Sequence, residues 1–434
     1  MNYYNIGNPK EKVTLREAVL KSINNVNGLY MPEYLPFLPP SFFERVHKMS
    51  FRATALEVSE ALLGSDLPFD VLEHIVNEAF TFDIPLRQLD NDLYVLELFH
   101  GPTLAFKDVG ARFMAGLFEY LVRDEEKEIT ILAATSGDTG SAVANAFFNR
   151  MGINVVILYP SGKVSEIQEK QLTTMGGNIT ALEVEGDFDD CQRLVKLAFA
   201  DADLTCRFNL TSGNSINIGR LLPQSFYYFY AFGQLPANCK PVVFSVPSGN
   251  FGNLTAGLIA MKMGLPVQHF IAATNSNHAV VDYLNTGKFE PSATRPTITN
   301  AMDVGNPSNF PRILNLFSNR CPDVSSVIKG YWFTDTQTRV GMIGLHKDHS
   351  YLADPHGAVG YLGLKKYMEN ADCTGIFLET AHPAKFLSEV EKVTKMKVNI
   401  PEQLKSILTL EKRSVRLSSD FIPFRDFLME NLNR

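Results

Sequence analysis

The chain has 434 residues, enough for two or three domains of about 150 residues each. Its net charge of −7 is spread along the chain without a basic stripe, which argues against a nucleic-acid partner. No apolar run approaches the ~20 residues of a membrane helix, and the N-terminus lacks the pattern of a signal peptide. The five cysteines are widely spaced and indicate reduced thiols. We therefore expect a cytoplasmic, globular protein.

Residues 1–92 are predicted to form a mostly helical accessory domain. Thr14 can cap the first helix, with Glu17 three residues later as its capping-box partner. Apolar residues at helical spacing predict helices over residues 15–23, 41–63 and 69–80. A proline-rich connector covers residues 31–40. The region carries no chemical motif.

From about residue 93, short apolar runs alternate with helical stretches. This alternation predicts parallel sheets covered by helices, with ligands beyond the carboxyl ends of the strands. The predicted strands are residues 129–134, 155–159, 181–184, 242–246, 270–274 and 375–378. Between residues 294 and 348 the pattern is too irregular for its elements to be placed.

Lys107 ends the segment His100-Gly-Pro-Thr-Leu-Ala-Phe-Lys107, and a helical pattern follows it. A lysine among apolar residues is a candidate for desolvation, which favours the neutral amine. A neutral buried amine can form a Schiff base with a carbonyl or with pyridoxal phosphate. The alternative is a lysine whose stem packs while its head reaches water. Two phosphate-type loops further along the chain favour the catalytic interpretation.

The segment Thr135-Ser-Gly-Asp-Thr-Gly140 follows the predicted strand at residues 129–134. Its hydroxyls and main-chain donors at a helix start suit a carboxylate or a phosphate. Asp138 would repel an anion, so it has another role or simply caps the helix.

The segment Asn214-Ser-Ile-Asn217-Ile-Gly-Arg220 brings amides, a hydroxyl and an arginine together. The forked guanidinium matches phosphate oxygens. The alternative is a solvated helix start with an ordinary surface arginine.

The segment Ser248-Gly-Asn-Phe-Gly252-Asn253 lies between a predicted strand and a helix. Glycine lets main-chain N–H groups approach an anion, and the helix adds its positive end. The alternative is a plain strand-to-helix turn that needs glycine for its geometry. Thr380, at the end of another predicted strand, has a hydroxyl that could meet a ring nitrogen.

Three histidines are interpreted as structural and not as metal ligands or catalytic residues. His346 and His349 have a spacing usable for metal, but no third ligand stands out, so we expect no metal site. We interpret His356 as a helix-start residue.

These segments, in this order, resemble the threonine synthase family of fold type II pyridoxal-phosphate enzymes. Gly28-Leu-Tyr-Met-Pro32 fits its longer branch, which has an N-terminal domain, and the likeness also rests on Asn300-Ala-Met-Asp-Val304 and Thr380-Ala-His-Pro-Ala-Lys385. The resemblance implies an α/β fold with two parallel-rich sheet domains covered by helices. We expect a catalytic region over 93–434, with a smaller subdomain at about 108–230 and a larger one from 93–107 and 231–434.

The resemblance also implies roles for individual residues. Lys107 would carry pyridoxal 5'-phosphate and act as the catalytic base. The cofactor would further be bound by Gly249, Asn250, Phe251, Gly252, Asn253, Thr380 and Asp138. The substrate would be bound by Ser136, Gly137, Thr139, Asn214, Ser215 and Arg220. Asn253 departs from the aspartate that the resemblance leads us to expect, which puts its side-chain contact in doubt.

The implied reaction converts O-phospho-L-homoserine and water into L-threonine and phosphate. The enzyme would be a monomer or a homodimer. The nearest rival is another fold type II lyase, such as a threonine or serine deaminase, which does not need a second phosphate site. A non-catalytic binding protein would lack the lysine or the phosphate loop, and the nucleotide-binding fingerprints are not in the sequence.

Overall fold

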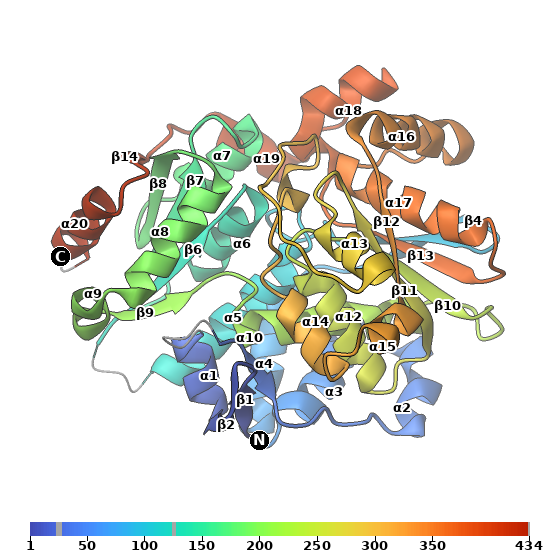
Figure 1. Ribbon diagram of the computed structural model, residues 1–434, viewed down its shortest axis with the longest axis horizontal. Coiled ribbons are helices and arrows are strands. Elements are labelled where there is room, and N and C mark those ends of the chain that lie inside the picture. The colour runs from blue at the N-terminus through green and yellow to red at the C-terminus, as the bar shows by residue number, and fades with distance from the viewer. Residues whose placement is uncertain (23–27, 124–126, 433–434) are drawn as a thin grey trace. The chain divides into compact units, whose positions relative to one another are not determined.

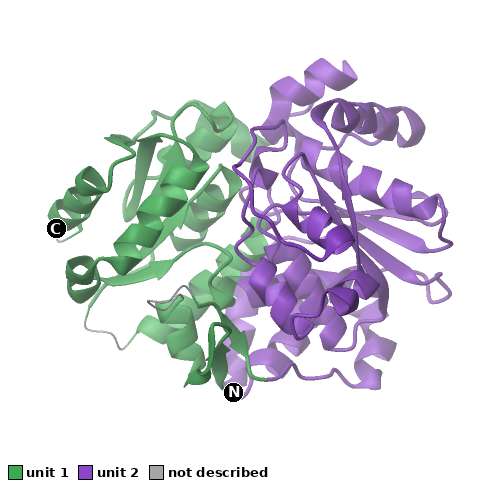
Figure 2. Cartoon of the chain, in the orientation of Figure 1, with its two compact units in different colours: residues 1–33, 107–220, 400–434 green, residues 34–106, 221–399 purple. Residues whose placement is uncertain are grey.

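The computed structural model describes residues 1–22, 28–123 and 127–432. Its chain forms two compact units, shown in Figure 2. Unit 1 comprises residues 1–33, 107–220 and 400–434, and unit 2 comprises residues 34–106 and 221–399. The contacts thus divide the predicted accessory segment, residues 1–92, between the two units. Among the described residues, no helix is both long and apolar enough to span a membrane.

Unit 1 is built on a five-stranded parallel sheet with strand order β14-β8-β7-β6-β9. Its strands are β6 (Ile129–Ala134), β7 (Ile153–Pro160), β8 (Ile179–Glu185), β9 (Asn209–Ser212) and β14 (Val415–Ser418). Its helices here are α5 (Lys107–Val122), α6 (Asp138–Phe147), α7 (Glu166–Thr173), α8 (Phe188–Ala200), α9 (Ala202–Arg207), α19 (Glu402–Leu408) and α20 (Phe421–Asn431). Apolar side chains of α8, α9 and α20 form a core with β6, β7 and β8. These helices and strands are labelled in Figure 1.

The N-terminal part of unit 1 contains strands that the sequence did not predict. A three-stranded antiparallel sheet joins β1 (Tyr3–Asn5), β2 (Asn8–Val13) and β3 (Tyr30–Pro32). The helix α1 (Leu15–Lys21) begins with the predicted capping box of Thr14 and Glu17, whereas Ile23, the predicted end, lies outside the described residues. The mostly helical segment expected here thus also contains a small sheet that the sequence did not reveal.

Unit 2 contains a six-stranded sheet with strand order β12-β11-β10-β13-β5-β4, in which β4 alone is antiparallel to its neighbour. Its strands are β4 (Leu86–Asp90), β5 (Leu93–Glu97), β10 (Val242–Pro247), β11 (Val267–Thr274), β12 (Ile328–Trp332) and β13 (Thr374–Glu379). Side chains of α17 (Pro355–Met368) pack with β5, β10, β11 and β13 to form its core. The two predicted parallel-rich sheets are thereby confirmed.

The remaining helices of unit 2 include four short or medium-length helices that begin in the segment 294–348, whose elements could not be placed from the sequence. The predicted helix over 41–63 is divided into α2 (Pro40–Arg45), η1 (Val46–Lys48) and α3 (Phe51–Leu63), because the Ser50 hydroxyl accepts a hydrogen bond from Ala53 N and starts a new helix. The others are α4 (Phe69–Ala79), η2 (Leu222–Ser225), α11 (Phe226–Gly233), α12 (Gly252–Lys262), α13 (Ala279–Thr286), η3 (Asn300–Met302), α14 (Phe310–Leu316), α15 (Cys321–Val327), α16 (Asp335–His349), η4 (Pro383–Phe386) and α18 (Leu387–Thr394). The short helix α10 (Ile218–Leu221) has its first three residues in unit 1 and its last in unit 2.

One aromatic pair marks the edge of the unit 2 sheet. Trp332, the single tryptophan of the chain, ends the edge strand β12. Its ring stacks on the imidazole of His278, with 4.4 Å between the ring centroids and 18° between the planes.

Candidate active site

In unit 1, the segments 135–140 and 213–220 leave the carboxyl ends of the neighbouring parallel strands β6 and β9. The Asn214 side chain joins them, because its Nδ2 donates to Ala134 O at 2.8 Å and its Oδ1 accepts from Ala134 N at 3.2 Å. Behind them, the Asn217 side chain donates to Val19 O of α1 at 2.9 Å. The structure therefore brings together two of the segments that the sequence singled out.

The first segment is shaped by Thr135, its first residue, which was not among the predicted substrate-binding residues. Its buried hydroxyl oxygen accepts hydrogen bonds from Gly137 N at 2.9 Å and from Gly140 N at 2.8 Å. The N–H of Gly137, one of the predicted substrate-binding residues, therefore already has an acceptor within the segment. Ser136 and Thr139 are both half-buried, which leaves part of each residue accessible to a ligand.

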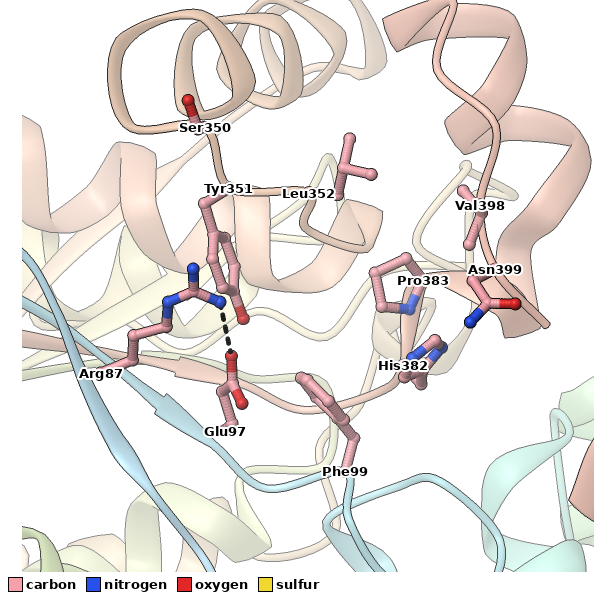
Figure 3. A pocket seen from close by; sticks show the side chains of 10 residues that line it. All are labelled: Arg87, Glu97, Phe99, Ser350, Tyr351, Leu352, His382, Pro383, Val398 and Asn399. Carbon is pink, nitrogen blue, oxygen red and sulfur yellow. Dashed lines mark ion pairs between the residues drawn. The ribbon is translucent and has the colours of Figure 1, made fainter. Parts of the chain in front are cut away.

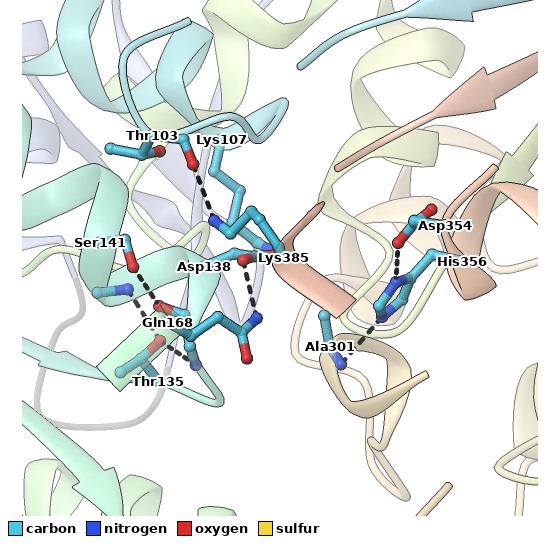
Figure 4. Close-up of polar contacts among 12 residues, drawn as sticks. Thr103, Lys107, Thr135, Asp138, Ser141, Gln168, Ala301, Asp354, His356 and Lys385 are labelled. Atoms are coloured by element: carbon cyan, nitrogen blue, oxygen red, sulfur yellow. Dashed lines mark hydrogen bonds and ion pairs between the residues drawn. The ribbon is translucent and has the colours of Figure 1, made fainter. Parts of the chain in front are cut away.

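Asp138 is the first residue of α6, and Gly137, not Asp138, is the capping residue. The N-cap alternative for Asp138 is therefore wrong. Its carboxylate accepts a hydrogen bond from Gln168 Nε2 at 2.9 Å and lies 3.6 Å from Lys107 Nζ (Figure 4). Gln168 is fully buried and was missed, although the capping box of Ser165 and Gln168 can be read from the sequence.

Lys107 is the first residue of α5, and its side chain is only 15% exposed. Most of the side chain is therefore withdrawn from water. The Asp138 carboxylate beside it is 3% exposed, and water screens such a buried pair of charges weakly.

Arg220 is also buried, at 2% exposure, so the alternative of an ordinary surface arginine is wrong. Its guanidinium donates to the main-chain oxygen of Gly213. Burial lowers the pKa of Arg220 to about 10, while the carboxylate of Asp108 opposes this shift. The arginine therefore carries its positive charge at neutral pH and fixes the start of the segment 213–220.

In unit 2, the segment 248–253 connects β10 to α12 and ends at a helix N-terminus. Within the described ranges, the main-chain N–H groups of residues 249–253 have no acceptor. Phe251 has a left-handed conformation with φ of 60°, which turns the chain into the helix. A Cβ atom on Gly249 would lie 2.7 Å from Met302 Cα, so glycine is required there. Residues 249–253 thus form an uncharged cradle of main-chain donors, of the kind that binds phosphate.

The side chains around this cradle hold its shape. Asn253 Nδ2 donates to Pro247 O at 2.8 Å and its Oδ1 accepts from Leu254 N at 2.9 Å. A carboxylate could not make the first of these bonds, which gives the unexpected asparagine a local structural role. Asn250 Oδ1 accepts from Ser308 N at 3.1 Å, and the fully buried Arg312 bonds the neighbouring Asn309.

Thr380 follows β13, the neighbour of β10, and is 5% exposed. Its main-chain oxygen accepts from Phe106 N at 2.9 Å, and Phe106 immediately precedes Lys107 in the chain. Two further main-chain bonds join the same segments, from Leu98 N to Glu379 O and from His382 N to Leu104 O, both at 3.0 Å. The segment that ends at Lys107 is thus fastened to the segment that carries Thr380.

A buried chain of polar residues supports the cradle and was missed by the sequence prediction. His356 Nε2 accepts from Ala301 N at 3.2 Å, and its Nδ1 donates to Asp354 Oδ2 at 2.5 Å (Figure 4). Glu379 Oε1 accepts from Asp354 N at 2.6 Å, and burial raises the pKa of Glu379 well above its usual range. His356 does stand at a helix start, as expected, but it also anchors the turn 300–302 that contacts Gly249.

Comparison with known proteins places this fold and these segments in one family. The family described as "Pyridoxal-phosphate dependent enzyme" matches residues 80–375. "Threonine synthase N terminus" matches residues 2–80, and "Threonine synthase, C-terminal" matches residues 357–427. This chain belongs to the threonine synthase family of pyridoxal-phosphate-dependent enzymes. The expected family and fold are therefore confirmed.

Individual threonine synthases cover the whole chain. That of Haemophilus influenzae is 45% identical over 99% of this chain and 100% of its own length. The crystal structure of threonine synthase from Escherichia coli has a TM-score of 0.94 and 43% identity, and 99% of each chain is covered. The structure of threonine synthase with bound PLP from Brucella melitensis has a TM-score of 0.91 and 32% identity over the full length of both chains.

Proposed function

We propose that this chain converts O-phospho-L-homoserine and water into L-threonine and phosphate, with pyridoxal 5'-phosphate as cofactor. The observation that carries the proposal is the Lys107 amine, which is nearly buried and lies 3.6 Å from a buried carboxylate. A second support is the full-length similarity to threonine synthases.

The residues present fit the cofactor. A phosphate group would satisfy the main-chain N–H groups of residues 249–253, which have no acceptor in the described parts of the chain. We assign its binding to Gly249, Asn250, Phe251, Gly252 and Asn253, the side chain of Asn253 acting only on the shape of the cradle. Thr380 would hydrogen-bond the pyridine nitrogen, and Lys107 would hold the aldehyde carbon. When bound, the cofactor supplies an electron sink for carbanion chemistry at the substrate.

Lys107 acts as the mobile base in this proposal. Its neutral amine takes the proton from the substrate Cα and returns a proton there at the end of the reaction. A positioned base contributes about 10²–10⁴-fold to the rate. The Asp138 carboxylate stabilises the ammonium form of Lys107, and Gln168 holds that carboxylate in place.

The substrate carries two anionic groups, and the chain offers donors for both. We assign the α-carboxylate to the segment of Ser136, Gly137 and Thr139, where the two hydroxyl-bearing residues are accessible and the engaged Gly137 N–H fixes the turn. We assign the phosphate to Asn214, Ser215 and Arg220. Arg220 supplies a permanent positive charge at the start of this segment.

The overall reaction balances without an oxidant or a reductant. The substrate loses its phosphate from Cγ after proton removal at Cα and Cβ. Water then adds its oxygen at Cβ, protons return to Cα and Cγ, and the products are L-threonine and inorganic phosphate.

The decisive experiment measures phosphate and threonine together. Purified enzyme with cofactor is supplied with O-phospho-L-homoserine, and equal amounts of both products are expected. The rival reading, a threonine or serine deaminase, predicts instead a 2-oxo acid and ammonia from free threonine or serine. Formation of a 2-oxo acid without phosphate release from phosphohomoserine would overturn the proposal.

Replacement of Arg220 tests the substrate-phosphate site independently of the cofactor-phosphate site. Arg220→Ala is expected to raise the KM for phosphohomoserine by about tenfold or more, because a charge-assisted bond is lost, while the cofactor stays bound. Arg220→Lys should restore part of the affinity. Unchanged kinetics in both variants would move the substrate phosphate to other residues.

A further inference from the structure

Unit 2 contains a pocket of about 350 Å³ that none of the residues assigned above lines (Figure 3). Small-ligand sites typically measure ~300–1,000 Å³ and combine apolar walls with a few polar groups. The pocket is lined by Arg87, Glu97, Phe99, Ser350, Tyr351, Leu352, His382, Pro383, Val398 and Asn399. It belongs to unit 2 alone, and its existence does not depend on the proposed reaction.

Two opposite charges share one side of the pocket. Arg87 Nη1 lies 3.8 Å from Glu97 Oε1, too far for a hydrogen bond. The other oxygen of Glu97 lies 2.8 Å from His100 Nε2. A carboxylate has about four acceptor positions, so Glu97 can bind a further cation. A ligand with both charges would satisfy the two residues better than they satisfy each other.

Tyr351 adds a donor beside this pair, as Figure 3 shows. The residue is 3% exposed, and its hydroxyl interacts with the Glu97 side chain but makes no hydrogen bond of standard geometry among the residues that the structure describes. Burial, followed by the charges of Glu379 and Glu97, raises the pKa of Tyr351 well above its usual value, so the hydroxyl keeps its proton. A buried hydroxyl without a well-formed hydrogen bond is costly, and a well-placed acceptor in the pocket would remove that cost.

The opposite side is neutral and largely apolar. Burial lowers the pKa of His382 to about 4, so its ring is uncharged at neutral pH. Its Nδ1 accepts from Ala384 N at 3.1 Å, which places the ring proton on Nε2. The apolar lining is provided by Phe99, Leu352, Pro383 and Val398.

We infer that this pocket binds a free α-amino acid with an apolar side chain. The α-carboxylate would meet Arg87 and the Tyr351 hydroxyl, and the α-ammonium would meet Glu97. The side chain would lie on the apolar lining. A simple anion would be repelled by Glu97 and a simple cation by Arg87, whereas the zwitterion satisfies both charges.

Such a ligand would contact both segments that lead to the proposed active site. Glu97 and Phe99 begin the segment that ends at Lys107, and His382 follows Thr380. The main-chain bonds from Leu98, Phe106 and His382 already hold these segments together. Occupancy of the pocket is therefore expected to change the catalytic rate, and this part of the inference rests on the proposed function.

The binding test uses holoenzyme reduced with borohydride, which fixes the cofactor to Lys107 and prevents amino acids from displacing it. L-leucine is titrated into this protein by calorimetry, and one site per chain is expected. Leucinamide lacks the carboxylate and 4-methylpentanoate lacks the ammonium, so each should bind about tenfold more weakly or worse.

Two arginine variants locate the site. Arg87→Met should weaken L-leucine binding by about tenfold or more. The control is Arg45→Met, which removes an arginine of similar exposure, 54% against 58%, from an ion pair elsewhere in unit 2. Tyr351→Phe should weaken binding without changing the fold. Absence of binding heat, or equal affinity in Arg87→Met, would overturn the pocket assignment.

Phosphate release by the unreduced enzyme tests the coupling. L-leucine is expected to change kcat, and Arg87→Met is expected to abolish that change. Binding without any effect on kcat would overturn the coupling. Failure of the proposed reaction itself is distinct, because it would abolish phosphate release with or without L-leucine.

Discussion

Lys107 is chemically distinctive because of its surroundings. Its side chain is largely withdrawn from water and has one carboxylate near its amine. Neither feature could be derived from residue spacing alone, since Asp138 lies on a different helix and could equally have been a capping residue. The apolar neighbours of Lys107 pointed to burial, but the identity of its partner required the fold.

Replacement of Lys107 tests the central assignment. Lys107→Ala should lower kcat by at least about 10²–10⁴-fold, because the mobile base is lost. It should also abolish the visible absorbance that appears when pyridoxal phosphate is added. Lys196→Ala, which removes an exposed lysine of α8, serves as the control. Retained turnover in Lys107→Ala would refute the assignment.

A substitution at Gly137 tests how Gln168 holds Asp138, the carboxylate beside Lys107. The φ of Gly137 is +133°, and a Cβ atom there would lie 2.4 Å from Gln168 Cδ. Gly137→Ala should therefore lower the free energy of unfolding by about 1–3 kcal/mol and displace Gln168 from Asp138.

Gly162→Ala is the matched control for this substitution. Gly162 also has a positive φ, +67°, but nothing lies within 4 Å of its Cβ position. The control carries a positive-φ strain, smaller than that at +133°, without the clash. Equal losses of stability and activity in the two variants would show that contact with Gln168 is unimportant.

At the scale of elements, much of the architecture could be predicted from the sequence. Buried parallel strands are continuous apolar runs, so the predicted runs at 129–134 and 242–246 fall within β6 and β10. By contrast, β2 has the sequence Asn-Pro-Lys-Glu-Lys-Val and is mostly exposed, so no apolar pattern marks it. Strand order and the contact between the turn 300–302 and Gly249 depend on long-range packing, which local patterns do not contain.

We expect the turn 300–302 to depend on the buried polar residues that run from Glu379 to Ala301. His356→Asn should weaken cofactor binding by about tenfold, because the shorter side chain cannot accept from Ala301 N. At saturating cofactor, kcat should change much less than affinity. Absorbance titration with pyridoxal phosphate measures the affinity, and His74→Asn, on the exposed surface of α4, is the control. An unchanged affinity would show that the turn does not depend on His356.

For the whole molecule, Asp303 provides a link between stability and pH. Burial raises the pKa of Asp303 to about 7, against hydrogen bonds from Thr297 and Asn275 that lower it. The folded state therefore retains a proton that the unfolded state releases at about pH 4. The stability from this group is fully present below the unfolded pKa and is lost as pH rises through about 7.

Asp303→Asn should remove this dependence. Urea unfolding of the variant and the parent is compared at about pH 5 and about pH 8. The free energy of unfolding of the parent relative to the variant should be lower at the higher pH. A difference that does not depend on pH would show that Asp303 titrates normally in the folded protein.

The position of Trp332 gives the protein an optical probe of its own. Excitation at the red edge selects the single indole, so its emission follows unit 2, whereas far-ultraviolet circular dichroism follows both units. If the two signals change at the same urea concentration, the units melt as one cooperative body. Separate midpoints would reveal that one unit stays folded at urea concentrations that unfold the other. The imidazole of His278, stacked on the indole, would affect the intensity of the emission during the titration.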